Sequence, residues 1–591
     1  MSSFRRAVYS DIPLIQKFIH ENFKKDHILS KNKALFVNEY VQQTNTLDQD
    51  AEINFYVYSH NQKIVSILGF YEYSEEYYLS LWSALKGSFY GIVLLKAVEK
   101  ALSDKPLRVI GLSSEAITLY KNLSYVVGKL NYQYFTKNTK KSTKKGISLD
   151  KKEIINAIGK DDNLVFYEKH LVRNPFVTYS SYYFLKERIQ IIYRKVTTPE
   201  NVFILVVDII GDIESVNLSM FQEVLDEENV EYGTLYASES FDFLQDVSDS
   251  ELVFSIYAHP YVAKNIDVHY AYKGEKPRIF KLRGDQERPA SLNEKYAIVN
   301  NFMYHYIRDS DIKQTVNNYL PQNIFEKHLT FLQKNYSNLK LIDLQNGDFS
   351  EIEEYYMLSF DDGYIEHEEF VAKLLTKNGV EGHFFVPKIE NDTLLKVNKI
   401  HQILNFFSVE EILSTIKTTV NGQEFTELFK KYVAKSEFDD ENTMFIKRYF
   451  QKNERAITVI NELFSRIPSS NYKDYYINEK QLKNMADFHI VGNHTCAHNH
   501  LTEYSIDEID KDIRSYEVKF SEYMNLKTVS YPYGSIYPEA MQLYEKYDYK
   551  YGFTVKSGYD IIPQSGKLDI NRYDCNELTM IINRKDEKND I

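Results

Sequence analysis

Two adjacent carboxylates stand at the end of a strongly apolar segment of the sequence. Residues 355–360 (YYMLSF) have the pattern of a buried strand, and Asp361, Asp362 and Gly363 follow directly. Two close carboxylates repel each other, so a cation that binds one of them stabilises the pair and leaves the other free to move protons. The alternative is a strand-end turn with two solvated acids, which a DDG tripeptide taken alone allows equally well.

A pair of histidines follows a second short apolar segment. His494 and His498 are four positions apart, a spacing that lets two imidazoles face one metal from a helical turn. With one aspartate, they would leave coordination positions open for water and substrate, as in a catalytic metal site. A chance histidine pair is the alternative for this motif alone. Cys496 lies between them as a soft ligand, but a residue two positions along a helical turn points away from such a metal.

A third motif, SYPYGS at residues 530–535, predicts a turn. Pro532 fixes one backbone angle and Gly534 permits a tight turn, so the amide of Tyr533 can point into a cleft as an oxyanion donor. An ordinary Pro-Gly turn is the alternative.

The segments that must position these motifs alternate between helical and strand periodicity, which predicts an α/β chain of several domains. The first is an α/β unit at residues 1–136. The expected parts that follow are a solvated basic linker at 137–149, a second α/β unit at 150–305, a helical connector at 306–343 and a C-terminal domain at 344–591. A charged helical stretch at about 388–484 carries no evident chemistry, and we expect it to be an insertion.

The composition excludes several classes of function. The 71 basic and 84 acidic residues give a net charge of −13, which disfavours binding to nucleic acid or to an anionic membrane. No apolar run reaches the roughly 18 residues of a membrane span, and Asp11 and Gln16 interrupt the apolar stretch that a signal peptide would need. Two cysteines cannot form a disulfide framework. We therefore expect a soluble, cytoplasmic protein.

The order of the three motifs resembles the polysaccharide deacetylase family, whose NodB-type carbohydrate esterase domain is a distorted (β/α) barrel. The family's TFDDG motif is matched by SFDDG at 359–363, and its histidine motif H-[ST]-x-x-H by HTCAH at 494–498. The SYPYGS segment is similar to the YPYG branch of the family, and GHFFV at 382–386 is similar to its second strand. The resemblance covers residues 344–390 and 480–580.

This resemblance implies a metal-dependent hydrolase that removes the N-acetyl group from an N-acetylated sugar in glycan or surface-polysaccharide biosynthesis. It makes Asp361 the general base and makes Asp362, His494 and His498 the ligands of one divalent metal, usually zinc. The amide of Tyr533 would stabilise the oxyanion together with the metal.

Two features of the family are missing. Its late Leu-x-His motif, whose histidine protonates the leaving amine, is absent because His500 is the last histidine of the chain. Either an upstream histidine such as His489 replaces it, or Asp361 returns its own proton. The arginine that precedes YPYG in much of the family is also absent, and we expect Arg572 to orient Asp361 through a charge-assisted ion pair. A surface arginine is the alternative for Arg572.

Residues 1–136 and 150–305 resemble tandem GNAT-type N-acetyltransferase domains, the first through residues 112–125 and the second through residues 173–176, 207–211 and 284–289. The turn at residues 86–91 precedes a helix where acetyl-coenzyme A would bind, but it lacks the family's Arg-x-x-Gly-x-Gly pattern. We therefore expect this half to be a binding or scaffolding module.

Three alternatives stay open at this point. The first is a bifunctional acetyltransferase and deacetylase that binds acetyl-coenzyme A, and the second is a non-catalytic carbohydrate-binding protein with a decayed metal site. The third, an iron oxygenase with two histidines and one carboxylate, leaves Asp361 and the YPYG turn without a role. The sequence does not identify the sugar, its carrier or the oligomeric state.

Overall fold

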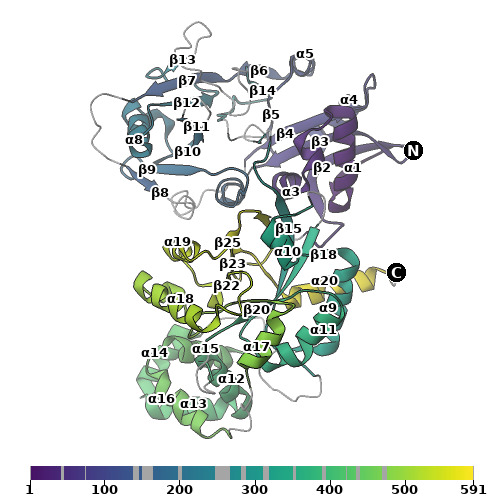
Figure 1. The fold of residues 1–591 in the computed structure, drawn as a ribbon. Coiled ribbons are helices and arrows are strands. Elements are labelled where there is room, and N and C mark those ends of the chain that lie inside the picture. The colour runs from purple at the N-terminus through teal and green to yellow at the C-terminus, as the bar shows by residue number, and fades with distance from the viewer. Residues whose placement is uncertain are drawn as a thin grey trace. The chain divides into compact units, whose positions relative to one another are not determined.

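A computed structural model divides the chain into two compact units, Met1–Lys295 and Tyr296–Ile591 (Figure 1). The residues outside the description are 1, 42–45, 74, 138–145, 150–163, 198–201, 247–266, 281, 283–287, 290, 310–318, 351–353, 389–393, 421, 434–439, 469–474 and 590–591. Most of the expected basic linker and the GDQE part of the motif at 284–289 therefore lie outside the described residues. None of the helices in the described part combines the length and hydrophobicity needed to cross a membrane.

The first unit is built on two seven-stranded sheets. The first sheet consists, in spatial order, of β1 (Ser2–Val8), β2 (Glu52–His60), β3 (Lys63–Glu72), β4 (Tyr77–Ala84), β5 (Leu107–Ile110), β14 (His269–Tyr272) and β6 (Val126–Lys129). The second consists, in the same manner, of β13 (Gln245–Asp246), β7 (Asn131–Thr136), β12 (Tyr232–Ala237), β11 (Val202–Ile210), β10 (Ile189–Thr197), β9 (Ser180–Phe184) and β8 (Ile147–Leu149).

Helices of the first unit pack on these sheets through their apolar faces. In α8, for example, Phe221, Val224 and Leu225 are buried in the core of the second sheet. The α-helices are α1 (Ile12–Phe18), α2 (Ile28–Lys31), α3 (Lys33–Tyr40), α4 (Tyr90–Ala101), α5 (Ser114–Asn122), α7 (Leu164–Tyr167) and α8 (Leu218–Glu228).

The two sheets of the first unit exchange strands, which corrects the expected boundary at residues 136 and 137. β7 comes from the first expected domain but pairs antiparallel with β12 of the second sheet. Conversely, β14 comes from the second expected domain and lies between β5 and β6 of the first sheet. Periodicity identifies a strand but not its partner, so this exchange could not be predicted from the sequence.

The second unit is built on a nearly closed, barrel-like sheet of mostly parallel strands, as predicted for the C-terminal region. Its strands are, in spatial order, β24 (Asp560–Pro563), β15 (Tyr296–Tyr304), β19 (Glu354–Phe360), β20 (His383–Val386), β21 (Ile490–Asn493), β22 (Thr528–Ser530), β23 (Tyr551–Phe553) and β25 (Lys567–Ile570). Off this path, β18 (Ser337–Asn338) pairs with β19, and β26 (Tyr573–Asp574) pairs with β15; β16 (Ile307–Arg308) and β17 (Leu320–Pro321) form a separate pair. The chain thus has the mixed α/β, multidomain class that the sequence predicts.

The barrel-like sheet begins upstream of the expected domain start at residue 344. β15 pairs in parallel with β19 from Ile298 to Tyr304, so residues 296–304 belong to this sheet rather than to the preceding α/β unit. The strand carries no recognisable motif, and its apolar pattern fits a strand of the preceding unit as well as a strand of the barrel.

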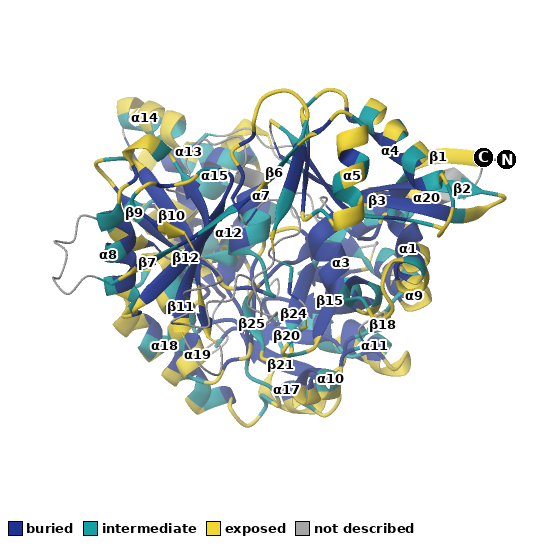
Figure 2. Cartoon of the chain, turned by 90° about the horizontal axis from the view of Figure 1, so that it is seen from above, coloured by how far each residue is buried: buried dark blue, intermediate teal, exposed yellow. Residues whose placement is uncertain are grey.

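Helices surround this sheet and also form the expected insertion. In α18, Ile509, Ile513, Tyr516 and Phe520 are buried at helical spacing while the opposite face is exposed, and Ser505 caps the helix (Figure 2). The helices around the sheet are α9 (Gln322–Asn335), α10 (Leu341–Asn346), α11 (Lys373–Lys377), α17 (Glu479–Ala486), α18 (Ile506–Phe520), α19 (Pro538–Lys546) and α20 (Cys575–Asn589). The helices of the insertion share a hydrophobic core and are α12 (Lys396–Phe406), α13 (Val409–Thr419), α14 (Gly422–Tyr432), α15 (Glu441–Lys452) and α16 (Ala456–Ser465).

Candidate metal centre

The predicted site residues follow the carboxyl ends of parallel strands. Asp361 follows β19, His494 follows β21, Tyr531 follows β22, and Arg572 lies two residues beyond β25. Because parallel strands of a barrel end at one edge, residues far apart in the sequence meet there. All six predicted site residues lie in the segments at this edge.

Asp362, His494 and His498 form a compact group of metal-ligand type. The Nε2 atoms of His494 and His498 lie 3.3 and 3.1 Å from Oδ1 of Asp362, and the three potential ligand atoms all lie within 4.8 Å of one another. Asp362 has a φ of 76° and Gly363 a φ of 65°, a left-handed turn that points the carboxylate toward the histidines. A Cβ at Gly363 would lie 2.9 Å from Cγ1 of Val386, so the turn requires glycine for space as well.

The hydrogen bonds around this group fit a bound cation. Nδ1 of His494 lies 2.8 Å from the carbonyl oxygen of Ser530, which can only accept, so Nδ1 carries a proton and Nε2, which faces Asp362, is the nitrogen that could bind a metal. Oδ1 of Asp362 accepts no hydrogen bond from any described residue. Two acceptors that face each other at 3.3 Å repel unless a cation lies between them. The three residues therefore fit a divalent metal, and three protein ligands would leave room on it for water or substrate.

The histidines are held by a loop rather than by the helical turn that their spacing predicts. Thr495 and His498 have φ values of 63° and 52°, and the left-handed turns bring both imidazoles onto Asp362. Cys496 points elsewhere, because its amide donates to Oδ2 of Asp512 at 2.9 Å and its thiol to the carbonyl oxygen of Asp512 at 3.3 Å. Burial raises the pKa of the Cys496 thiol to about 12, which also disfavours it as a ligand.

Arg572 holds Asp361 in a buried, bidentate ion pair. Its Nη1 donates to Oδ1 at 2.9 Å and its Nη2 to Oδ2 at 2.8 Å, while its Nε donates to the carbonyl oxygen of Thr554 at 2.7 Å. The Arg572 side chain is wholly buried. Burial alone would raise the pKa of Asp361, but the charge and the hydrogen bonds of Arg572 oppose it, and the pKa is lowered to about 2. Asp361 is therefore a carboxylate at neutral pH.

A chain of hydrogen bonds connects the metal-ligand group to the insertion. The hydroxyl of Tyr364 donates to Oδ2 of Asp362 at 2.5 Å, and Nδ2 of Asn398 in α12 donates to that hydroxyl at 2.8 Å. Asn398 is fully buried and also accepts from the hydroxyl of Tyr476. The insertion thus fixes the oxygen of Asp362 that faces away from the histidines.

Tyr533 lies beside the histidines in the YPYG turn. Its φ is 59°, and its ring packs edge-on against His498 at 4.9 Å and stacks on His500 at 4.0 Å. Its side chain is 37% exposed, so it borders the open side of the centre. Gly534 has a φ of 64° and leaves no room for a Cβ beside Val555, which accounts for the glycine in this motif.

His489, the expected upstream replacement for the missing late histidine, lies at the other end of β21. It precedes the strand that His494 follows, and a rise of about 3.3 Å per residue separates the two by roughly 16 Å. Its ring bonds to Thr376, Ala372 and Gly382 instead. We therefore correct that expectation.

His305 is a site residue that the motif analysis missed. The register pairs Tyr304 with Phe360, so His305 and Asp361 follow directly on neighbouring parallel strands. His305 is half-buried and interacts electrostatically with both Asp361 and Asp362. The sequence offered one indication, an apolar segment at 296–304 that a histidine follows directly, but only the strand register connects this histidine to the site.

Comparison with known proteins identifies the class of the C-terminal part. Residues 439–552 match the family model described as polysaccharide deacetylase, and this segment includes His494, His498 and Tyr533. This part of the chain is therefore similar to polysaccharide deacetylase domains, which supports a carbohydrate deacetylase. No curated protein sequence matches the chain.

Several solved structures are similar to parts of the chain. One is the Streptococcus pyogenes deacetylase PplD in complex with acetate, with 14% identity, coverage of 47% of this chain and 93% of that chain, and a TM-score of 0.30. Another is IcaB from Ammonifex degensii, with 13% identity, 47% and 91% coverage, and a TM-score of 0.28. A GCN5-related N-acetyltransferase from Anabaena variabilis has 11% identity, 51% and 79% coverage, and a TM-score of 0.34. At such TM-scores these likenesses are distant, and the residue roles below rest on the site itself.

Proposed function

We propose that this protein is a metal-dependent carbohydrate N-deacetylase that hydrolyses the acetamide of an N-acetylated sugar to acetate and a free amine. The observation that carries the proposal is the pairing of two different acids at one edge of the barrel. Asp362 faces two imidazoles as a metal ligand would. Asp361 next to it is not part of that group and is kept ionised by its ion pair with Arg572. Zinc is the metal we expect, and a cytoplasmic location remains a prediction.

Asp361 has one atom available to act as the base. A carboxylate offers about four lone-pair positions, two on each oxygen. Oδ2 accepts from Nη2 of Arg572 and from the hydroxyl of Ser530 at 3.0 Å, whereas Oδ1 accepts only from Nη1 of Arg572 among the described residues. Oδ1 therefore accepts the proton of the attacking water, whose oxygen forms the new bond to the acetyl carbon.

A carboxylate with so low a pKa is a weak base, so the water must itself be made more acidic. Asp362, His494 and His498 would hold a divalent metal, which would supply this acidity and polarise the acetamide carbonyl when bound. The chain contributes the orientation of the base, and the amide of Tyr533 is the proposed second donor to the oxyanion. When the carbon–nitrogen bond breaks, the leaving nitrogen needs a proton.

His305 is our proposed donor of that proton. It follows the strand beside the one that Asp361 follows, and the imidazole is the side chain that most often transfers protons in catalysis. After the reaction Asp361 carries the proton it took from water and His305 lacks the one it donated, so return of one proton to His305 restores the starting state. This assignment replaces His489, which the structure places at the opposite end of β21.

Release of acetate from a panel of N-acetylated sugars and oligosaccharides, combined with elemental analysis, tests the proposal. We expect about one divalent metal per chain and acetate release that chelation abolishes and added zinc restores. Metal-loaded protein that releases no acetate from any member of the panel would contradict the proposed reaction. Acetate release that survives complete removal of the metal would contradict its metal dependence.

A further inference from the structure

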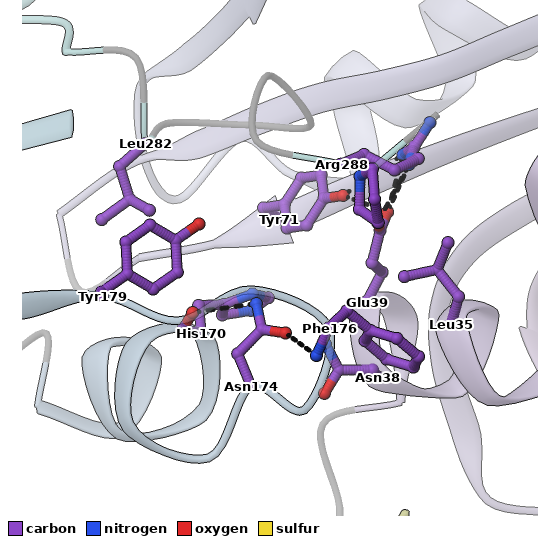
Figure 3. A pocket seen from close by; sticks show the side chains of 11 residues that line it. Leu35, Asn38, Glu39, Tyr71, His170, Asn174, Phe176, Tyr179, Leu282 and Arg288 are labelled. Carbon is purple, nitrogen blue, oxygen red and sulfur yellow. Dashed lines mark hydrogen bonds and ion pairs between the residues drawn. The ribbon is translucent and has the colours of Figure 1, made fainter. Parts of the chain in front are cut away.

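Two features of the molecule have no part in the reaction proposed above. One is a small pocket in the first unit, where Glu39 and Arg288 already pair with each other at 2.7 Å (Figure 3). The other is His401, a histidine of helix α12 in the insertion, which lies near the metal-ligand group without belonging to it. The second feature has a direct connection to the centre.

His401 is joined to the metal-ligand group through hydrogen-bonded side chains. Its Nδ1 lies 2.9 Å from the hydroxyl of Tyr306, and Nδ2 of Asn398 donates to the same hydroxyl at 3.0 Å. Asn398 also donates to the hydroxyl of Tyr364, which in turn donates to Asp362. The rings of Tyr306 and Tyr364 stack at 4.2 Å. The imidazole of His401 therefore has a fixed position relative to the centre.

The ring of His401 is close enough to the centre to interact electrostatically with Asp362, His305 and His498. Burial lowers the pKa of His401 to about 4, so the ring is neutral at neutral pH. A neutral imidazole has one nitrogen that donates and one that accepts. His401 thus presents a hydrogen-bonding group beside the centre and adds no charge to it.

The second nitrogen of this ring is open. No described residue forms a hydrogen bond with Nε2 of His401, and this atom is accessible to solvent, because the side chain is only half-buried. Tyr533, which packs against His498, is the other accessible side chain at this edge. When an acetamide lies at the metal centre, the sugar ring that carries it must occupy the accessible space beside the centre. Nε2 of His401 faces solvent in that region.

We propose that His401 is a specificity-determining residue, whose Nε2 binds a hydroxyl of the sugar that carries the acetamide. A sugar hydroxyl both donates and accepts, so either tautomer of the imidazole can bind it. The insertion then selects the substrate in addition to supporting Asp362. This inference rests on the proposed deacetylase function.

Acetate release by the zinc-loaded full chain tests the proposal. The probes are the N-acetylated sugars and oligosaccharides of the acetate-release panel, including the methyl glycosides of N-acetyl-D-glucosamine and N-acetyl-D-galactosamine. His401→Asn can keep the hydrogen bond to Tyr306 but lacks Nε2. We expect it to raise KM about tenfold and to change kcat less than about threefold, because a hydrogen bond made equally to substrate and transition state affects binding alone.

Monodeoxy analogues of the panel member that is hydrolysed fastest distinguish a direct contact from a structural change. In the parent protein, loss of the hydroxyl that His401 binds should lower kcat/KM about tenfold, whereas in His401→Asn the same loss should lower it less than about twofold. His401→Gln places an amide near the position of Nε2 and should recover most of this discrimination. A variant that only disturbed the insertion would lower kcat/KM equally for every analogue.

Gln423→Asn shortens an exposed polar side chain of α14 in the same insertion, and this matched control should leave KM and kcat unchanged. Metal analysis and thermal denaturation show whether each variant is loaded and folded, and His401→Ala replaces His401→Asn if the latter does not fold. The proposal is overturned if a folded, metal-loaded variant discriminates among the analogues as the parent protein does. A loaded parent protein that releases no acetate from any panel member overturns the deacetylase function itself, on which this inference rests.

Discussion

Asp361 and Arg572 form a bidentate ion pair across 211 positions of sequence, with oxygen-to-nitrogen distances of 2.9 and 2.8 Å. The pair holds the carboxylate by both oxygens and keeps it ionised although it is buried. This arrangement gives the base a fixed direction, and it leads to the first prediction.

Arg572→Lys should retain the metal but lower kcat for acetate release by about 10- to 100-fold, because a lysine cannot make the bidentate pair. Arg572 lowers the pKa of Asp361 from 3.8 to about 2, against the opposing effect of burial. Weakening that pair raises this pKa, so the base becomes protonated at higher pH and the acid limb of the pH–rate profile shifts upward. An unchanged acid limb together with an unchanged kcat would contradict the positioning role.

Asp361→Asn should keep the metal and reduce turnover by about 10²- to 10⁴-fold, because the amide preserves the shape but cannot accept the proton. Metal content and single-turnover acetate release are the measurements, made well below the unfolding temperature since Arg572 loses its counter-charge. Near-normal turnover would rule out Asp361 as the base.

His494→Ala and Asp362→Ala should each remove the metal, since three protein ligands hold one ion. Cys496→Ser is the matched control, because its thiol bonds to Asp512 and not to the centre. Elemental analysis after dialysis distinguishes the outcomes. Equal metal content in the two ligand variants and the unmodified protein would show that the ligand assignment is wrong.

Tyr364→Phe should weaken metal affinity by about 10- to 100-fold, because Asp362 loses the hydrogen bond that orients its outer oxygen. Tyr449→Phe is a suitable control, since the buried hydroxyl of Tyr449 has no partner among the described residues. Competition with a chelator measures both affinities. Equal affinities would mean that the insertion does not support the centre.

His305→Asn should slow the breakdown of the carbon–nitrogen bond and lower single-turnover acetate release by about 10²- to 10⁴-fold, because asparagine cannot donate a proton to the leaving nitrogen. The comparison is His500→Asn, which alters a histidine that stacks on Tyr533 at the same edge. If His500→Asn slows acetate release and His305→Asn does not, the proton donor is His500.

Residues whose role follows from local spacing could be predicted from the sequence. The SFDDG and HTCAH motifs predicted one site made of Asp361, Asp362, His494 and His498. The structure places these residues at one edge of the barrel. Arg572 was expected beside Asp361, and the structure places it there. These residues all lie in short motifs or next to a strand end.

Residues whose position depends on long-range pairing could not be predicted. His305 reaches the site only because β15 pairs in parallel with β19, and the motif search had no reason to include β15 in the barrel. Asn398 reaches Tyr364 from an insertion that shows no chemical pattern in its sequence. The helical turn expected for the two histidines was wrong because left-handed residues at 495 and 498 bend the loop more tightly.

The exchange of β7 and β14 determines when the first unit can fold during synthesis. Between β5 and β6 the first sheet has a gap that only β14 fills, and β14 is translated after most of the second sheet. A ribosome-bound chain that ends before residue 269 therefore presents two unpaired strand edges, which invite aggregation. In most multidomain chains the amino-terminal domain folds first during synthesis. Here the first sheet cannot be completed before β14 has been translated. A stop codon after residue 136 would give an open sheet and a strand without its partners rather than an independent domain.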